Sequence, residues 1–381
     1  MTPSDFKPIQ IIHVTTDSKI GGAEHLLIWI AKYVDQSRYP FVFCTLSKWG
    51  PLNDALKQMG HTVFSLDMDS VGAFPKAWIK FRKILADVNP DLVHSHLLTA
   101  GLLATFSVRG NIHLHHRHYG NFFKNRGGFL KKLLDRVLVH SAGHLLAVSA
   151  AVKDDLVRRL KVPIQRVSVL ENAIDLECFD RLRVGVPARS MIQAALAKKR
   201  GPYIGMVANF HAGKGHKVLI DSIKDLLKKW PDLLVLFVGE GDGEAVVREY
   251  VRNADVEAQV LFCGYVADIA PVMAKFDVLV VPSLSEGFGL VACEAMALKV
   301  PVVASGIEGL KEIVVHEQSG LLFENGNSKE LSQMICRIFD NADFRQILIK
   351  NAYDRVNEKF SMKNYAEKLQ KFYEQRSGVH L

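Results

Sequence analysis

Along this chain, short apolar runs alternate regularly with longer segments whose apolar residues recur at helical spacing. The clearest short runs are residues 9–14, 41–46, 62–66, 91–94, 112–115, 145–149 and 167–170, and then 203–208, 233–238, 260–263, 278–281, 300–304 and 321–323. Short apolar runs that alternate with helices are typical of parallel strands whose sheet is covered on both faces. The alternation therefore predicts the α/β fold class.

The alternation lapses once, between residues 175 and 202, where no clear strand appears. A chain of 381 residues is long enough for two domains. We expect two doubly wound, Rossmann-like domains, at residues 1–185 and 186–360, and a C-terminal helix within 361–381 that packs back on the first. Because ligands of such sheets bind beyond the carboxyl ends of the strands, two facing domains predict a cleft between them.

Composition narrows the cellular setting. The chain has 48 Lys and Arg against 40 Asp and Glu, a net charge of +8, which admits an anionic partner. Its five cysteines are scattered without a C-x-x-C pair, as expected for thiols in a reducing compartment. No apolar run reaches the ~20 residues that span a bilayer, and the first residues do not resemble a signal peptide. We expect a cytoplasmic protein whose membrane contact, if any, is peripheral and on the inner face.

Two glycine-containing loops occupy equivalent places in the two domains. Gly21 and Gly22 follow the first apolar run and open a helical segment, where backbone N–H groups favour an anion. Lys214 lies between two glycines just before a helical segment of the second domain, where a cation could neutralise phosphate. The alternatives are a tight turn for the glycine pair and a solvated loop lysine for Lys214.

The most specific pattern covers residues 282–297, where a strand, a glycine-rich loop and a helix follow one another. Glu286 lies in the loop and Glu294 lies in the otherwise apolar helix. An ionised carboxylate offers several acceptor sites and so suits the recognition of hydroxyl groups on a polyol. A carboxylate buried in an apolar helix needs a partner, which favours a ligand over a purely structural role.

Taken in order, these motifs resemble family 4 of the retaining GT-B glycosyltransferases, and the resemblance extends from Ile11 to about residue 376. It rests further on 148–149 (Val-Ser), 172–175 (Asn-Ala-Ile-Asp), 239–241 (Gly-Glu-Gly), 261–264 (Leu-Phe-Cys-Gly), 301–305 (Pro-Val-Val-Ala-Ser) and 320–323 (Gly-Leu-Leu-Phe). The resemblance implies an acceptor-side N-terminal domain and a C-terminal domain that binds a UDP-sugar or GDP-sugar. It also implies that no metal and no other cofactor is needed.

The resemblance assigns donor contacts residue by residue. Lys214 would contact the diphosphate and Glu294 the ribose hydroxyls, while Gly22 would complete the phosphate cradle. The donor sugar and β-phosphate would be held by Glu286 and the backbone of Gly287, Phe288, Gly289 and Leu290. The base would lie near Phe262 to Tyr265. Lys214 and Glu286 would therefore act in catalysis as well as in binding.

One position departs from the family pattern. The family often places an Arg five residues before the lysine, and this chain has Asn209 there. His211 or an Arg elsewhere could substitute for the missing cation.

Histidines gather in the N-terminal domain, in the segments 94–96 and 113–118. The second segment resembles the region of the family's active-site histidine, which we place at His118, with His116 as the alternative register. Imidazole is also a common zinc ligand, so a metal site is an open alternative. Against a metal site, no carboxylate or cysteine accompanies the histidines at ligand spacing.

Residues 101–170 carry 12 basic against 3 acidic residues. The basic positions that interleave with Phe and Leu are Arg117, Lys124, Arg126, Lys131, Lys132 and Arg136. Such a face predicts contact with an anionic membrane surface, at about 1 kcal/mol per nearby cation; an ordinary solvated helix is the alternative. Nucleic acid is not expected, because no recognition motif accompanies the charge.

The hypothesis from the sequence is a hexosyltransferase that moves a hexosyl or N-acetylhexosaminyl group from a nucleotide-sugar to a hydroxyl acceptor. A lipid-linked glycan of surface polysaccharide or lipopolysaccharide synthesis is the favoured acceptor. One alternative is a sugar-nucleotide epimerase of the same fold. Another is a nicotinamide-dependent oxidoreductase, for which the glycines at 239–243 have the wrong spacing. A catalytically silent sugar-binding module is the third.

Overall fold

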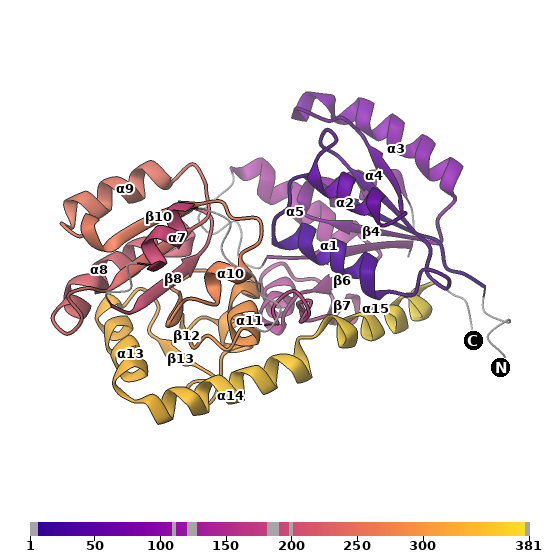
Figure 1. Ribbon diagram of the computed structural model, residues 1–381. Coiled ribbons are helices and arrows are strands. Elements are labelled where there is room, and N and C mark those ends of the chain that lie inside the picture. The colour runs from indigo at the N-terminus through magenta and orange to yellow at the C-terminus, as the bar shows by residue number, and fades with distance from the viewer. Residues whose placement is uncertain (1–6, 109–111, 120–127, 181–189, 198–200, 378–381) are drawn as a thin grey trace. The chain divides into compact units, whose positions relative to one another are not determined.

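A computed structural model describes residues 7–108, 112–119, 128–180, 190–197 and 201–377 (Figure 1). The chain forms two compact units. Unit 1 comprises Met1–Ala173 and Met362–Leu381, and unit 2 comprises Ile174–Ser361. Unit 2 begins before the boundary predicted after residue 185, and its first residue, Ile174, donates its N–H to the Phe360 carbonyl of the same unit across 2.9 Å.

Unit 1 is built on a seven-stranded parallel sheet of order β3-β2-β1-β4-β5-β6-β7. The strands are β1 (Ile11–Thr15), β2 (Phe41–Thr45), β3 (Thr62–Ser65), β4 (Leu92–His96), β5 (His113–Arg117), β6 (His144–Ala147) and β7 (Val167–Val169). The helices are α1 (Gly22–Tyr33), α2 (Pro51–Gln58), α3 (Phe74–Val88), α4 (Leu98–Ser107), α5 (Phe129–Ser141), α6 (Ala150–Asp154) and α15 (Met362–Arg376). Helix α4 contacts α3 and α5, and helix α1 contacts α2 and α15.

Unit 2 repeats this plan with a six-stranded parallel sheet of order β10-β9-β8-β11-β12-β13. Its strands are β8 (Tyr203–Val207), β9 (Leu234–Val238), β10 (Val260–Gly264), β11 (Val278–Val281), β12 (Val302–Ser305) and β13 (Leu321–Phe323). Its helices are α7 (Ser190–Ala197), α8 (His216–Leu227), α9 (Glu244–Asn253), α10 (Ala270–Met273), α11 (Leu290–Ala297), α12 (Glu308–Lys311), α13 (Ser328–Asp340) and α14 (Ala342–Lys359). The predicted α/β class with two doubly wound sheets is confirmed.

Each sheet has a point where the strand order reverses, between β1 and β4 in unit 1 and between β8 and β11 in unit 2. The loops that leave the carboxyl ends of these neighbouring strands run in opposite directions and leave a crevice, where open α/β sheets bind ligands. In unit 2 the predicted donor loops follow β8 and β11. In unit 1 the Gly21–Gly22 turn follows β1, and His96 is the last residue of β4. The fold therefore places the predicted motifs of each unit at its reversal point.

None of the helices in the described ranges combines the length and apolar composition needed to cross a membrane.

Candidate functional site

The two predicted donor loops of unit 2 are joined to each other by backbone contacts. The loop after β8 contains a short 3-10 helix, Ala212–Lys214, and ends at Gly215 with φ of 76°. A Cβ atom at Gly215 would lie 1.9 Å from the Pro282 carbonyl oxygen at the start of the other loop. The Leu284 N–H also donates to the Gly213 carbonyl across 2.9 Å. Only glycine satisfies both the left-handed backbone and the close approach, so the two loops form one rigid surface.

This surface brings Lys214 and Glu286 together, although they are far apart in the sequence. The Lys214 ammonium donates to Glu286 Oε2 across 2.6 Å, and the Ser283 hydroxyl donates to the same oxygen across 3.1 Å. Both members of the ion pair are partly exposed and so accessible to a ligand. Ser283 was not predicted, because a serine after a strand has no distinguishing signal in the sequence.

The amino-terminal end of α11 offers backbone donors beside this ion pair. Gly289 precedes the helix with φ of 109°, a left-handed conformation that favours glycine. The N–H groups of Phe288, Gly289 and Leu290 donate to no carbonyl or side chain among the described residues. Backbone N–H groups at a helix start form a ready site for a phosphate or carboxylate.

Glu294 lies on the second turn of α11 and is half-buried among apolar neighbours. Burial raises the pKa of its carboxyl group from 4.5 to about 7, because the charged form is poorly solvated there. Its side chain makes no hydrogen bond or ion pair with any described residue. A carboxyl group with unused acceptors at this place could receive hydroxyl donors of a ligand.

The residues predicted near a base are less enclosed. Phe262 on β10 is partly buried and stacks on Phe210, with ring centroids 5.7 Å apart. Arg248 lies over the Phe262 ring at 4.0 Å and also pairs with Glu244. Tyr265 is exposed, as is Asn209, which stands where the family often has its phosphate-binding Arg. No contact among them identifies a base site, so these assignments stay predictions.

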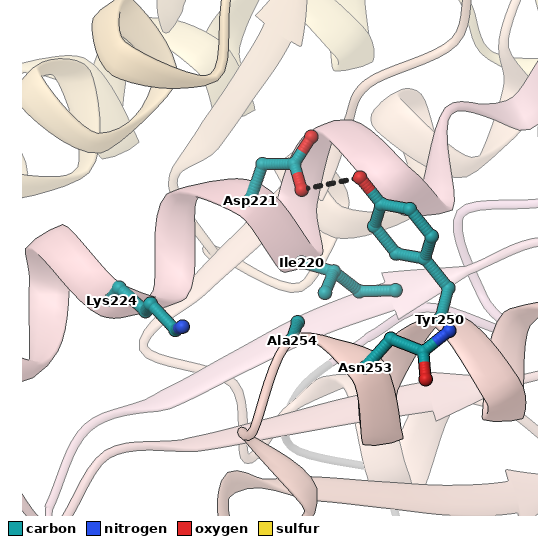
Figure 2. Close-up of a pocket in the computed structure, with 6 residues that line it drawn as sticks. All are labelled: Ile220, Asp221, Lys224, Tyr250, Asn253 and Ala254. Carbon is teal, nitrogen blue, oxygen red and sulfur yellow. Dashed lines mark hydrogen bonds between the residues drawn. The ribbon is translucent and has the colours of Figure 1, made fainter.

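A cavity of about 290 Å³ lies between α8 and α9 (Figure 2). It is lined by Ile220, Asp221, Lys224, Tyr250, Asn253 and Ala254, and the Tyr250 hydroxyl donates to Asp221 across 2.8 Å. None of the predicted donor residues lines this cavity.

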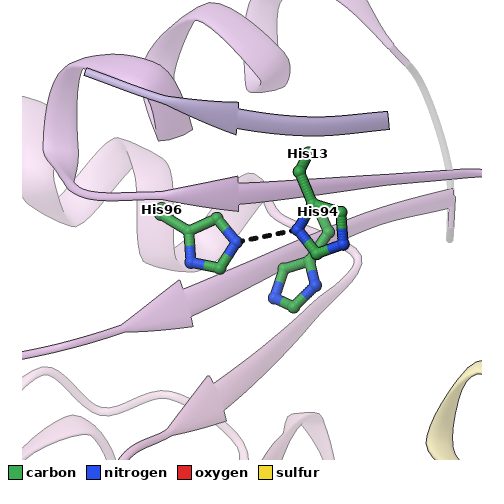
Figure 3. A group of neighbouring side chains, drawn as sticks. All are labelled: His13, His94 and His96. Carbon is green, nitrogen blue, oxygen red and sulfur yellow. Dashed lines mark hydrogen bonds between the residues drawn. The ribbon is translucent and has the colours of Figure 1, made fainter. Parts of the chain in front are cut away.

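In unit 1, five histidines lie on one face of three adjacent strands. They are His13 on β1, His94 and His96 on β4, and His116 on β5 with His118 just beyond it. Figure 3 shows His13, His94 and His96, with the hydrogen bond of 3.1 Å between His13 Nδ1 and His96 Nε2. A further bond of 3.0 Å joins His96 Nδ1 to His118 Nε2. Desolvation by burial lowers the pKa of His13 to about 3 and that of His118 to about 4, so both imidazoles are neutral near pH 7.

The two histidines predicted as alternative active-site registers differ in exposure. His116 is fully buried, whereas His118 is partly exposed. Only His118 is therefore accessible to a ligand without rearrangement of the strand. Leu97, which follows His96, has φ of 66°, a conformation that bulky residues rarely adopt. Backbone strain of this kind concentrates at functional sites.

The same histidines could geometrically hold a metal ion. Two groups, His13 with His94 and His96, and His96 with His116 and His118, each have three nitrogens within 4.8 Å of one another. Three neutral imidazoles are a ligand set that Zn²⁺ accepts. The cluster contains no carboxylate, and the hydrogen bonds already described occupy several of its nitrogens.

The Gly21–Gly22 turn is less suited to an anion than the sequence indicated. The Gly21 N–H donates to Glu24 Oε2 across 3.2 Å, so one of its donors is already used. Burial raises the pKa of Glu24 from 4.5 to about 7. A predicted phosphate contact of Gly22 would therefore lie beside a carboxyl group that is only about half protonated near pH 7.

The predicted basic face is corrected at Arg117. This residue is fully buried and forms a bidentate ion pair with the equally buried Asp135 of α5, so it cannot contact a membrane. Lys131, Lys132 and Arg136 are exposed. Lys124 and Arg126 lie outside the described residues. Three large apolar side chains share the exposed surface of α5: Phe129, Leu130 and Leu133.

The chain matches two protein-family models and resembles several known proteins. The model "Glycosyltransferase Family 4" matches residues 20–178, and the model "Glycosyl transferases group 1" matches residues 189–355. The chain is 24% identical over 389 residues to the UDP-Gal:alpha-D-GlcNAc-diphosphoundecaprenol alpha-1,3-galactosyltransferase of Escherichia coli, covering 97% of this chain and 98% of that protein. It is 27% identical over 302 residues to an uncharacterized glycosyltransferase, MJ1178, of Methanocaldococcus jannaschii, covering 78% of each. The solved structure of Anabaena Alr3699/HepE in complex with UDP has a TM-score of 0.80 at 21% identity, covering 96% of this chain and 100% of that one.

Proposed function

Because this chain belongs to the family 4 glycosyltransferases and has their GT-B fold, we propose that it transfers a hexosyl or N-acetylhexosaminyl group from a UDP-sugar to a hydroxyl acceptor with retention. The observation that carries the proposal is the rigid surface of unit 2 at the reversal point of its sheet. There Lys214 offers a cation, the amides at the start of α11 offer donors, and Glu286 and Glu294 offer acceptors for a diphosphate, a sugar and a ribose. UDP is favoured over GDP because the Anabaena structure holds UDP and the E. coli relative is named for UDP-Gal.

In the proposed reaction the bond between the sugar C1 and the diphosphate oxygen breaks. The acceptor oxygen bonds to C1 on the same face, and its proton passes to the departing diphosphate. Lys214 and the amides of Phe288, Gly289 and Leu290 stabilise the charge that develops on the diphosphate. Glu286 binds sugar hydroxyls and Glu294 binds the ribose. On this proposal no metal is required, so EDTA leaves the rate unchanged.

The binding proposal is tested with UDP, GDP and UDP-glucose as probes, by thermal shift and calorimetry. We expect Lys214→Ala and Glu294→Ala to weaken UDP binding by about tenfold or more, since each removes a charge-assisted contact worth about 1.5–3 kcal/mol. Lys224→Ala is the matched control, because it removes a lysine from the α8–α9 cavity of unit 2 (Figure 2). UDP binding that survives both site changes but is lost in the control would move the donor site to the α8–α9 cavity.

For the acceptor we propose a lipid-linked glycan at an anionic membrane surface. The support is the exposed surface of α5, where three cations lie among three apolar side chains, and the diphosphoundecaprenol in the name of the E. coli relative. Three cations at about 1 kcal/mol each predict that neutralising Lys131, Lys132 and Arg136 weakens binding to anionic vesicles by roughly 100-fold.

The vesicle experiment has a control within the same unit. Lys363, Lys368 and Lys371 are exposed on α15, so replacing them with Gln removes the same charge from another helix. If both triple variants lose binding equally, net charge rather than the α5 surface is responsible.

The need for an acceptor distinguishes the proposed transferase from the epimerase alternative. An epimerase converts a UDP-sugar when it is alone, whereas the proposed transferase releases UDP at a substantial rate only when a hydroxyl acceptor is present.

A further inference from the structure

The buried histidines of unit 1 form a continuous hydrogen-bonded series that ends on the C-terminal helix. His118 Nε2 contacts His96 Nδ1 at 3.0 Å, and His96 Nε2 contacts His13 Nδ1 at 3.1 Å. His13 Nε2 contacts the Tyr373 hydroxyl at 3.3 Å, and that hydroxyl contacts His94 Nδ1 at 2.8 Å. We call this series the imidazole chain. Its members in order are His118, His96, His13, Tyr373 and His94.

His96, His13 and Tyr373 each make two hydrogen bonds within the imidazole chain. Each of them donates in one of these bonds and accepts in the other. A neutral imidazole has one N–H and one lone-pair nitrogen, and a tyrosine hydroxyl donates one proton and accepts at its oxygen. Burial lowers the pKa of His94 and His96 well below 6.5, so these rings are neutral as well. All four bonds must therefore run in the same direction. If the bonds donate from His94 toward His118, all four histidines of the imidazole chain are Nδ1–H tautomers. If they donate from His118 toward His94, all four are Nε2–H tautomers.

We propose that the imidazole chain holds its four histidines in one common tautomer, and that Tyr373 is thereby a positioning residue for His118, which it does not touch.

His94, at the end of the imidazole chain opposite His118, indicates which of the two directions is favoured. His94 Nε2 is buried and has no hydrogen-bond partner among the described residues. In the Nε2–H direction this atom would be a buried donor without an acceptor, whereas in the Nδ1–H direction it is an unused lone pair. Orphaned buried N–H groups are rarer than unused acceptors, which favours the Nδ1–H direction.

This direction defines what His118 can do. Its Nε2 accepts from His96, and its Nδ1 carries a proton that no described residue accepts. His118 therefore offers a hydrogen-bond donor to a ligand and is not a general base. That this ligand is the donor sugar rests on the proposed function, whereas the tautomer of the chain does not.

The test is nitrogen NMR of the protein labelled with ¹⁵N-histidine, in which long-range correlations distinguish the two tautomers. Signals of His118 and His94 are assigned from their loss in His118→Gln and His94→Gln. We expect Nδ1–H signals for all four histidines of the chain in the unliganded protein. Two different tautomers among the four would overturn the proposal. So would a pattern that disappears after EDTA treatment, because a metal ion would then order the cluster.

Tyr373→Phe tests the positioning role, since it removes the hydroxyl that joins His13 to His94. We expect the His118 signals to change from a single tautomer to an average of both. Tyr365→Phe is the matched control: Tyr365 is buried on the same helix, and its hydroxyl has no partner among the described residues. Unchanged His118 signals in Tyr373→Phe, or an equal change in Tyr365→Phe, would refute the role of Tyr373. A failure of UDP-sugar binding would refute the proposed function and leave this result standing.

Discussion

Glu294 is expected to reduce the stability of unit 2 above neutral pH, and Glu294→Gln should remove that cost. Burial raises its pKa from 4.5 to about 7, so the folded state binds the proton more tightly than the unfolded chain. A shift of this size corresponds to about 3 kcal/mol. Because the pKa of Glu294 is higher in the folded state, the free energy of unfolding falls as the pH rises from about 4.5 to about 7 and is constant above about 7. Partial exposure of the side chain lowers the expected effect to about 1–3 kcal/mol.

The assay is thermal or urea unfolding of Glu294→Gln and the wild type at pH 5 and pH 8. Glutamine keeps the shape of the side chain and is neutral at both values. At pH 8 we expect the variant to be more stable by about 1–3 kcal/mol, or roughly 2–10 °C in Tm for a domain of this size. At pH 5 the gain should fall below about 1 kcal/mol, because the folded wild type is then already protonated. Glu249→Gln, at an exposed position of α9 in the same unit, is the matched control.

A gain that is equal at pH 5 and pH 8, or a loss of stability at pH 8, would refute the reasoning. The proposed function adds a second readout. If the Glu294 carboxylate accepts ribose hydroxyls, UDP binding favours its ionised form and releases a proton near neutral pH. Calorimetry in two buffers of different ionisation enthalpy should detect that proton in the wild type and lose it in Glu294→Gln. A stabilised variant that binds UDP poorly is the expected outcome for a residue retained for function.

Three further predictions follow from named contacts. Asp135→Asn leaves the buried Arg117 charge without its partner and should cost about 3–5 kcal/mol in urea unfolding, and a loss below about 1 kcal/mol would mean that water reaches this pair. Gly215→Ala places a Cβ atom against the Pro282 carbonyl at a φ of 76° and should weaken UDP binding as well as stability. Gly326→Ala is the control, because Gly326 has a φ of 84° and open space around it, and the change should cost only the backbone strain of about 1 kcal/mol. Glu286→Gln frees Lys214 from its ion pair, so UDP should bind at least as tightly while sugar transfer falls; weaker UDP binding would show that Glu286 supports Lys214 instead of competing for it.

The fold class could be predicted from the sequence because each strand and helix of both units has its own local pattern of apolar residues. Short buried strands and helical periodicity recur throughout, and each glycine-rich loop lies between a strand and a helix. Lys214 and Glu286 could be predicted individually for this reason. Their direct contact could not, because it depends on β8 and β11 being neighbours, and strand order is not a local property of the chain.

The sequence misled where burial is decided by distant segments. Arg117 has basic neighbours and reads as part of a surface patch, yet it ends an internal strand and pairs with Asp135 on the following helix. Tyr373 was not among the predicted site residues. Its contact with His94, on a strand near the middle of unit 1, follows only when α15 is placed on the sheet.

Charge has different roles in the two units. In unit 1 Arg117 is buried and balanced by Asp135, so of the predicted basic face only Lys131, Lys132 and Arg136 are exposed among the described residues. In unit 2 Lys214 is already paired with Glu286, and Glu294 is half-protonated near pH 7. The proposed donor site therefore has little net charge before a nucleotide binds. Its affinity must then come from short-range contacts with the amides and Lys214. The proposed attraction of the α5 surface to a membrane instead acts over about a Debye length and should be lost at high salt.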